Sequence, residues 1–179
     1  MLTDSEKQFL LRLARSSLES AVRRTPLPSL GPCDASLLEP RGAFVTLRES
    51  SELRGCIGYV DPLKPLAHTV REVTAKAALE DLRFPPIGPH ELAGIGIEIS
   101  VLSPLARVDR ITDIELGTHG LMIEFGKNRG LLLPQVPVEN GWDRETFLIQ
   151  TSKKAGLPPL IWQHRDARTF TFTAEVFSE

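Results

Sequence analysis

Hydrophobic residues recur at the spacing of an α-helix in three segments of the chain. The first helix is predicted over residues 4–24, where Thr3 and Glu6 have the spacing of a capping box. A second helix is predicted between Pro62 and Leu82, and a third over residues 143–155 with its first aspartate as the cap. Each of these segments ends at residues that disfavour a helix, such as glycine and proline.

Strict alternation of apolar with small or polar residues predicts β-strands elsewhere. The clearest alternation covers residues 94–101, with isoleucines on one face and Glu98 and Ser100 on the other. Further strands are predicted at residues 43–47, 53–59, 120–125, 130–133 and 169–176. Because most of these strands are neighbours in the sequence, joined by polar turns at 49–52 and 126–129, we expect an α+β fold with a largely antiparallel sheet and flanking helices.

Charge and composition narrow the class of protein. The chain has 179 residues, enough for one sizeable core, with 21 basic against 23 acidic residues and a net charge of -2. Lysine and arginine are not concentrated in any segment, which argues against a nucleic-acid-binding protein. No apolar run approaches the ~18 residues of a membrane span, so a soluble cytoplasmic protein is expected. The cysteines, Cys33 and Cys56, are too few for a disulfide scaffold and are expected to be reduced.

One strand carries a cysteine in an unusual setting. Cys56 lies two residues from Arg54 and is followed by Gly58, and all three share one face if the strand is regular. A guanidinium beside the sulfur would favour the thiolate, and Gly58 would leave room for a ligand. The alternative is that Cys56 is a small buried apolar side chain and that Gly55 and Gly58 are bulge or packing positions. The residues alone leave both interpretations open.

The segment Leu53–Gly58 reads LRGCIG and resembles the signature of the AMMECR-type domain family, known as protein A of the AmmeMemoRadiSam system. Further segments resemble family elements and occur in the family's order along most of the chain. They are Asp81 with Leu82–Phe84, Ile97–Leu102, Gly120-Leu121, Gly130–Val136, Gly141-Trp142, and Lys154–Pro158 with Trp162.

The resemblance implies an α+β domain in two lobes, with the LRGCIG segment near the cleft between them. The whole chain would form one such domain, with a larger lobe containing both termini and a smaller inserted lobe. Memo-like and radical-SAM proteins are the partners that it implies, and it brings no established reaction. Relatives commonly have a cysteine before the segment that here begins at Lys154, where this chain has Thr151-Ser152-Lys153, so a second thiol at that position is excluded.

Three further residues are candidates for the site. Glu98 could pair with Arg54 or accept a proton, or it could be an exposed or salt-bridged carboxylate on the sheet. Arg83 could bind an anionic ligand or, with Asp81, tie the end of a helix to the following loop. Gln135 follows a proline at the end of a predicted strand, where its amide could donate to and accept from a ligand at the cleft rim.

Two functional hypotheses follow. In the first, the cleft binds a small molecule or a partner's peptide, Cys56 acts as a nucleophile or redox thiolate, Arg54 activates it or clamps an anion, and Glu98 is an acid or base. Ligand contacts would come from Gly55, Gly58, Arg83 and Gln135. In the second, the protein is a noncatalytic binding module that acts with a Memo-like or radical-SAM partner. No metal or cofactor is expected, because the histidines and cysteines have no metal-ligand spacing.

Overall fold

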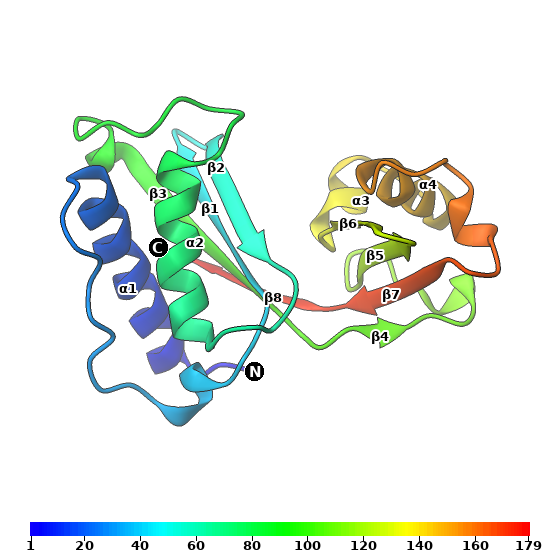
Figure 1. The fold of residues 1–179 in the computed structure, drawn as a ribbon, viewed down its shortest axis with the longest axis horizontal. Helices are drawn as coiled ribbons and strands as arrows, with labels where there is room; N and C mark the ends of the chain where they lie inside the picture. The colour runs from blue at the N-terminus through cyan, green and yellow to red at the C-terminus, as the bar shows by residue number, and fades with distance from the viewer. The chain divides into compact units, whose positions relative to one another are not determined.

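The structure, a computed structural model, describes residues 1–179 and divides into two compact units. Unit 1 comprises Met1–Leu102 and Glu175–Glu179, and unit 2 comprises Ser103–Ala174. Figure 1 shows the elements of each unit in the order of the chain. No helix combines the length and the apolar character needed to cross a lipid bilayer.

Unit 1 is a four-stranded sheet in the order β2-β1-β3-β8, with both of its α-helices packed on the same face (Figure 1). Its elements are α1 (Asp4–Val22), η1 (Ala35–Leu38), β1 (Ala43–Glu49), β2 (Glu52–Tyr59), α2 (Leu66–Leu79), η2 (Leu92–Gly94), β3 (Ile95–Leu102) and β8 (Ala174–Ser178). Strand β1 is antiparallel to β2 and to β3. Alternate residues of these strands are fully buried against the helices, as in the row of Val45 and Ile99 on β1 and β3.

The capping box predicted for the first helix is confirmed. Thr3 Oγ accepts a hydrogen bond from the Glu6 backbone N–H at 3.3 Å, and the Glu6 carboxylate accepts one from the Thr3 N–H at 2.6 Å. Helix α2 is shorter than predicted, because it ends at Leu79 and Leu82 is fully exposed in the following turn. At this point the chain leaves the helix, and the carboxylate of Asp81 accepts a hydrogen bond from the Cys56 N–H of strand β2.

Gly55 allows β2 to pack closely against α2. A Cβ atom at this position would lie 2.2 Å from the backbone carbonyl oxygen of Ala77, far inside van der Waals contact. Gly55 is buried and lies opposite Leu47, whose side chain belongs to the core of unit 1. Gly55 is therefore a packing position on the helix-covered face, which was one of the alternatives for the glycines of this segment.

Unit 2 is a second four-stranded sheet in the order β4-β7-β5-β6. Its elements are β4 (Ala106–Arg107), η3 (Ile111–Asp113), β5 (Gly120–Phe125), β6 (Asn128–Leu132), α3 (Gln135–Glu139), α4 (Arg144–Lys154), η4 (Ile161–Gln163) and β7 (Arg168–Phe172). Helix α4 packs on β5 and β6 and buries Phe147 and Leu148 with three aliphatic residues of unit 2. Asp143 caps α4 as predicted, since its carboxylate accepts from the Thr146 N–H at 2.8 Å.

The α+β class with antiparallel strand pairing is confirmed, but the strands are distributed over two sheets. The segment 169–176, predicted as one strand, is divided at Thr173: β7 pairs within unit 2, whereas β8 joins the sheet of unit 1. At this point the Thr173 backbone N–H donates to Ser103 Oγ and its carbonyl accepts from the Ser103 N–H, both at 2.9 Å. The predicted turn at 126–129 is also shorter, because β6 already begins at Asn128.

Replacing Gly55 with alanine is expected to lower the free energy of unfolding by about 1–3 kcal/mol, the usual cost of overpacking. The added methyl group would meet backbone, which cannot rotate away as a flexible side chain can. Gly96→Ala in β3 is the matched control, because the nearest atom to its new Cβ lies at 3.9 Å. Urea denaturation of both variants measures the difference, and equal midpoints would contradict this packing.

Candidate functional site

The backbone of Cys56 is bound by side chains at the edge of the unit 1 sheet. Strand β2 is an outer strand, and an outer strand has N–H and C=O groups without a neighbouring strand. The Cys56 N–H donates to Asp81 Oδ2 at 2.8 Å, and the Cys56 carbonyl accepts from Arg83 Nη2 at 3.2 Å. The two side chains thus take the place of a neighbouring strand at this residue.

Asp81 and Arg83 also bind each other. Arg83 donates from Nε to Asp81 Oδ1 at 2.9 Å and from Nη2 to Asp81 Oδ2 at 2.7 Å. The Asp81 side chain is only 6% exposed, and the Arg83 guanidinium holds the pKa of this carboxyl well below its usual range. The backbone N–H groups of Cys56 and Arg83 contribute to the same shift, while burial opposes it. Of the two roles weighed for Arg83, the structure shows the tie to Asp81.

The side chain of Cys56 lies on the face of the sheet that carries neither helix, here called the helix-free face. Thr46 is directly opposite on β1, and its hydroxyl donates to Cys56 Sγ at 3.3 Å. Glu98 is directly opposite Thr46 on β3, so the three residues form one row across three strands, here called the Cys56 row. Thr46 is buried, whereas Cys56 and Glu98 are half-buried.

The two ends of the Cys56 row are too far apart for direct proton transfer. Adjacent strands are separated by about 4.8 Å, so the backbones of Cys56 and Glu98 lie roughly 10 Å apart. The Glu98 carboxylate makes neither a hydrogen bond nor an ion pair with another side chain, unlike every carboxylate described above. A molecule lying over Thr46 could contact both the sulfur and this carboxylate.

Arg54, predicted to lie beside the sulfur of Cys56, makes no hydrogen bond to it. In the register of β1 and β2, Leu47 is opposite Gly55 and Arg48 is opposite Leu53, so Arg54 is the extra residue of a β-bulge. A bulge interrupts the alternation of faces on which the prediction depended. The expected pairing of Arg54 with Glu98 is not formed either.

The guanidinium of Arg54 binds the loop that follows α2. It donates from Nε to Glu91 Oε1 at 2.8 Å, from Nη2 to Glu91 Oε2 at 3.2 Å and from Nη1 to the Pro85 carbonyl at 2.7 Å. The two side chains are 13% and 15% exposed, and Arg54 holds the pKa of Glu91 below its usual range. Arg54 therefore fixes the path of the chain from α2 to β3.

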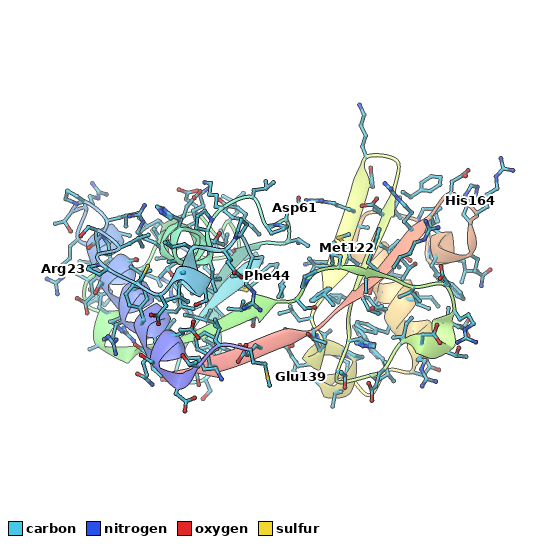
Figure 2. The ribbon with its side chains drawn as sticks, turned by 90° about the horizontal axis from the view of Figure 1, so that it is seen from below. Arg23, Phe44, Asp61, Met122, Glu139 and His164 are labelled. Carbon is cyan, nitrogen blue, oxygen red and sulfur yellow. The ribbon has the colours of Figure 1, made fainter.

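The other predicted ligand contacts have different surroundings. Gly58 is opposite Phe44 (labelled in Figure 2), and a Cβ atom at Gly58 would lie 2.3 Å from the Phe44 ring. The space above Gly58 is thus occupied by an aromatic side chain. Gly55 faces α2, and Gln135 is the first residue of α3 in unit 2, whereas the Cys56 row lies in unit 1.

Sequence reasoning missed Thr46 and Glu91. Thr46 is a polar residue inside an otherwise apolar strand, and this was the one local signal that it faces away from the core. Glu91 offered no local signal, because its partner Arg54 is 37 residues away in the chain. Both residues are identified only by contacts between segments.

The profile of the AMMECR1 family matches residues 11–177. The chain belongs to the AMMECR1 family. A protein of Thermococcus onnurineus is 45% identical in an alignment of 190 positions, which covers 99% of this chain and 92% of that protein. Protein MK0488 of Methanopyrus kandleri is 43% identical, with 99% and 90% covered. The crystal structure of the uncharacterized protein PH0010 of Pyrococcus horikoshii superposes with a TM-score of 0.93 at 40% identity, covering 99% of this chain and 93% of that one.

Replacing Asp81 with asparagine is expected to destabilise this AMMECR1 protein by about 1–3 kcal/mol at neutral pH, since a buried charged acceptor is lost. Because the folded pKa of Asp81 is depressed, its contribution is complete above the unfolded pKa of about 3.9 and is lost as the pH falls further toward the folded pKa. The difference in the free energy of unfolding between the variant and the natural protein should therefore become smaller below about pH 4.

Denaturant titrations at several pH values measure this difference. Asp113→Asn is the control, because Asp113 forms an ion pair with Arg110 in which the side chains are 47% and 78% exposed. Its loss should change the free energy of unfolding by less than about 0.5 kcal/mol. If the free energies of unfolding of Asp81→Asn and the natural protein differ by the same amount down to pH 2, the ionised carboxylate is not the source of the difference.

Proposed function

We propose that this AMMECR1 protein binds a small molecule or a peptide segment of a partner protein on the helix-free face of unit 1, over the Cys56 row. The observation that carries the proposal is the half-buried carboxylate of Glu98, which has no partner and shares the row with a half-buried thiol. Partial burial removes water from a charged group, and a cationic or hydrogen-bonding ligand would compensate for that loss.

The surroundings of Cys56 favour binding over cysteine catalysis. A catalytic thiol needs a base within hydrogen-bond reach, but the sulfur of Cys56 bonds to the hydroxyl of Thr46, and Glu98 lies one strand further away. Arg54, the predicted activator, binds Glu91. A rigid backbone at Cys56, held by Asp81 and Arg83, would present a fixed surface to a ligand.

A cysteine-dependent reaction is the second candidate, because the Arg83 guanidinium interacts electrostatically with the Cys56 side chain and Thr46 contacts the sulfur. The hydrogen bond from Thr46 Oγ to Cys56 Sγ would stabilise negative charge on the sulfur. In this version Cys56 is the nucleophile or redox thiolate. Glu98 would then act on the bound substrate and not on the thiol, because of the distance between the two ends of the row.

Memo-like and radical-SAM proteins are the partners that we propose from the sequence resemblance. With purified proteins of both kinds from the same genome, biolayer interferometry should detect binding to at least one of them. Glu98→Lys should weaken it at least about tenfold, which corresponds to about 1.4 kcal/mol. Glu19→Lys on the exposed side of α1 is the charge-matched control and should have no effect. Cys56→Ser should retain binding if the module is noncatalytic.

If neither partner binds, the small-molecule version is tested by native mass spectrometry of protein purified from its own source. A bound mass should be present in the natural protein and in Glu19→Lys, and absent in Glu98→Lys. Equal occupancy in all three proteins would place the ligand elsewhere and would refute the role of the helix-free face.

The cysteine-dependent version makes a separate prediction about alkylation. In a Cys33→Ser background, Thr46→Val should slow the reaction of Cys56 with iodoacetamide by about 2- to 10-fold at fixed pH, the range of a single hydrogen bond. Valine has nearly the shape of threonine, so access to the sulfur is preserved. Thr25→Val, at an exposed threonine, is the control. An unchanged or faster reaction of Thr46→Val would show that the hydroxyl does not activate the sulfur.

A further inference from the structure

Residues at the beginning of α2 line a hollow in unit 1. Figure 1 shows this end of the helix, where the chain arrives from β2. The hollow has a volume of about 410 Å³ and is here called the α2 hollow. Its lining residues are Leu27, Lys64, Pro65, His68, Arg71 and Glu72. We propose that the α2 hollow binds a small organic anion, with a phosphate or carboxylate group against the guanidinium of Arg71.

The guanidinium of Arg71 has only neutral partners. Nη1 donates to the Pro28 carbonyl at 3.1 Å and Nη2 to His68 Nδ1 at 3.3 Å, whereas Nε is buried without any partner. No carboxylate forms an ion pair with Arg71. Arg71 as a whole is half-buried, and a partly buried charge without an ionic partner loses part of its hydration without compensation. An anion in the hollow would balance the charge of the guanidinium.

Glu72, the one acidic residue of the hollow, is already paired with lysines. The carboxylate of Glu72 accepts hydrogen bonds from Lys64 Nζ and from the Tyr59 hydroxyl, and Lys76 Nζ lies 3.5 Å from it. Lys64 and Tyr59 hold the pKa of Glu72 below its usual range, so it stays ionised and bound to these groups. With Glu72 between two lysines, the charge of Arg71 is in excess, and the hollow as a whole favours an anion.

His68 adds a hydrogen-bond donor. A guanidinium can only donate, so His68 Nδ1 accepts the bond from Arg71, and the ring proton of the neutral imidazole is on Nε2. Helix α2 also begins at this site without a side-chain cap, since its N-cap residue is Pro65. The N-terminal end of a 14-residue helix attracts negative charge, which acts in the same direction as the side chains.

The size and the walls of the hollow indicate an organic anion. Ligand sites of small molecules usually measure about 300–1,000 Å³ and combine apolar walls with a few polar groups. Leu27 and Pro65 provide apolar surface beside the charged groups. We therefore expect a ligand with one anionic group and a small apolar part. This site is independent of the proposed function, because its residues lie outside the Cys56 row.

Isothermal titration calorimetry with phenyl phosphate, benzoate and inorganic phosphate tests the proposal on the full chain. Arg71→Gln should weaken binding of the organic anions at least about tenfold, because a charged hydrogen bond contributes about 1.5–3 kcal/mol. Lys64→Gln should weaken it less, since Lys64 is half exposed and shared with Glu72. Arg23→Gln removes an equal charge at the exposed C-terminal end of α1 (Figure 2) and should leave the affinity unchanged within about twofold.

The probes distinguish the sources of the anionic group. Binding of phenyl phosphate alone assigns a phosphate ester, binding of benzoate alone assigns a carboxylate, and binding of both supports a general anion site. The absence of binding by every probe at millimolar concentration would overturn the proposal, and so would equal affinity of Arg71→Gln and the natural protein. If Arg71→Gln does not fold, the affinity of Lys64→Gln for the organic anions is the test. The side chain of Lys64 is 50% exposed, so its loss leaves the core intact.

Discussion

The β-bulge at Arg54 determines which face of the unit 1 sheet presents Cys56. The turn at Ser50-Ser51 pairs Glu49 with Glu52, and a regular hairpin continued from this pair would place Cys56 opposite Val45. Val45 is fully buried beneath the helices, so the thiol would point into the core. The extra residue shifts the register by one, and Cys56 then lies opposite Thr46 on the helix-free face. The accessibility of the sulfur therefore depends on the bulge, whose extra residue, Arg54, bonds to Glu91.

The chain between α2 and β3 carries the groups that hold β2 in this register. Asp81 and Arg83 bind both backbone groups of Cys56, and Glu91 binds Arg54. Because the outer edge of β2 is occupied here by side chains, it is not open to another strand at Cys56. The same bonds explain why α2 ends early: Asp81 accepts from β2 and from the N–H of Arg83, which is incompatible with another helical turn. One short segment thus ends a helix and fixes the strand beside it.

Local elements of this fold could be predicted from the sequence, whereas the pairing between distant segments could not. The capping box of α1, the alternation of β3 and the cap of α4 are contacts within a few residues, and all three were predicted. The division of residues 169–176 between two sheets was missed. The alternation of apolar and polar residues predicts a strand but does not indicate which strands it pairs with. For the candidate site, the motif identified Cys56 and the alternation placed Glu98, but the partner of Arg54 is Glu91, which is 37 residues away in the chain. The cleft between two lobes stays a prediction.

The two proposed sites of unit 1 differ in the sign of the charge that lacks a partner. Glu98 leaves a negative charge on the helix-free face, and Arg71 leaves a positive charge on the side of α2 that faces away from the core. The groups that hold Cys56 follow the C-terminal end of α2, whereas the α2 hollow lies at its N-terminal end, and a 14-residue helix is about 21 Å long. A ligand of drug-like size cannot reach both ends of such a helix. Substitutions at Glu98 and Arg71 should therefore act independently, and the failure of one proposed site would leave the argument for the other unchanged.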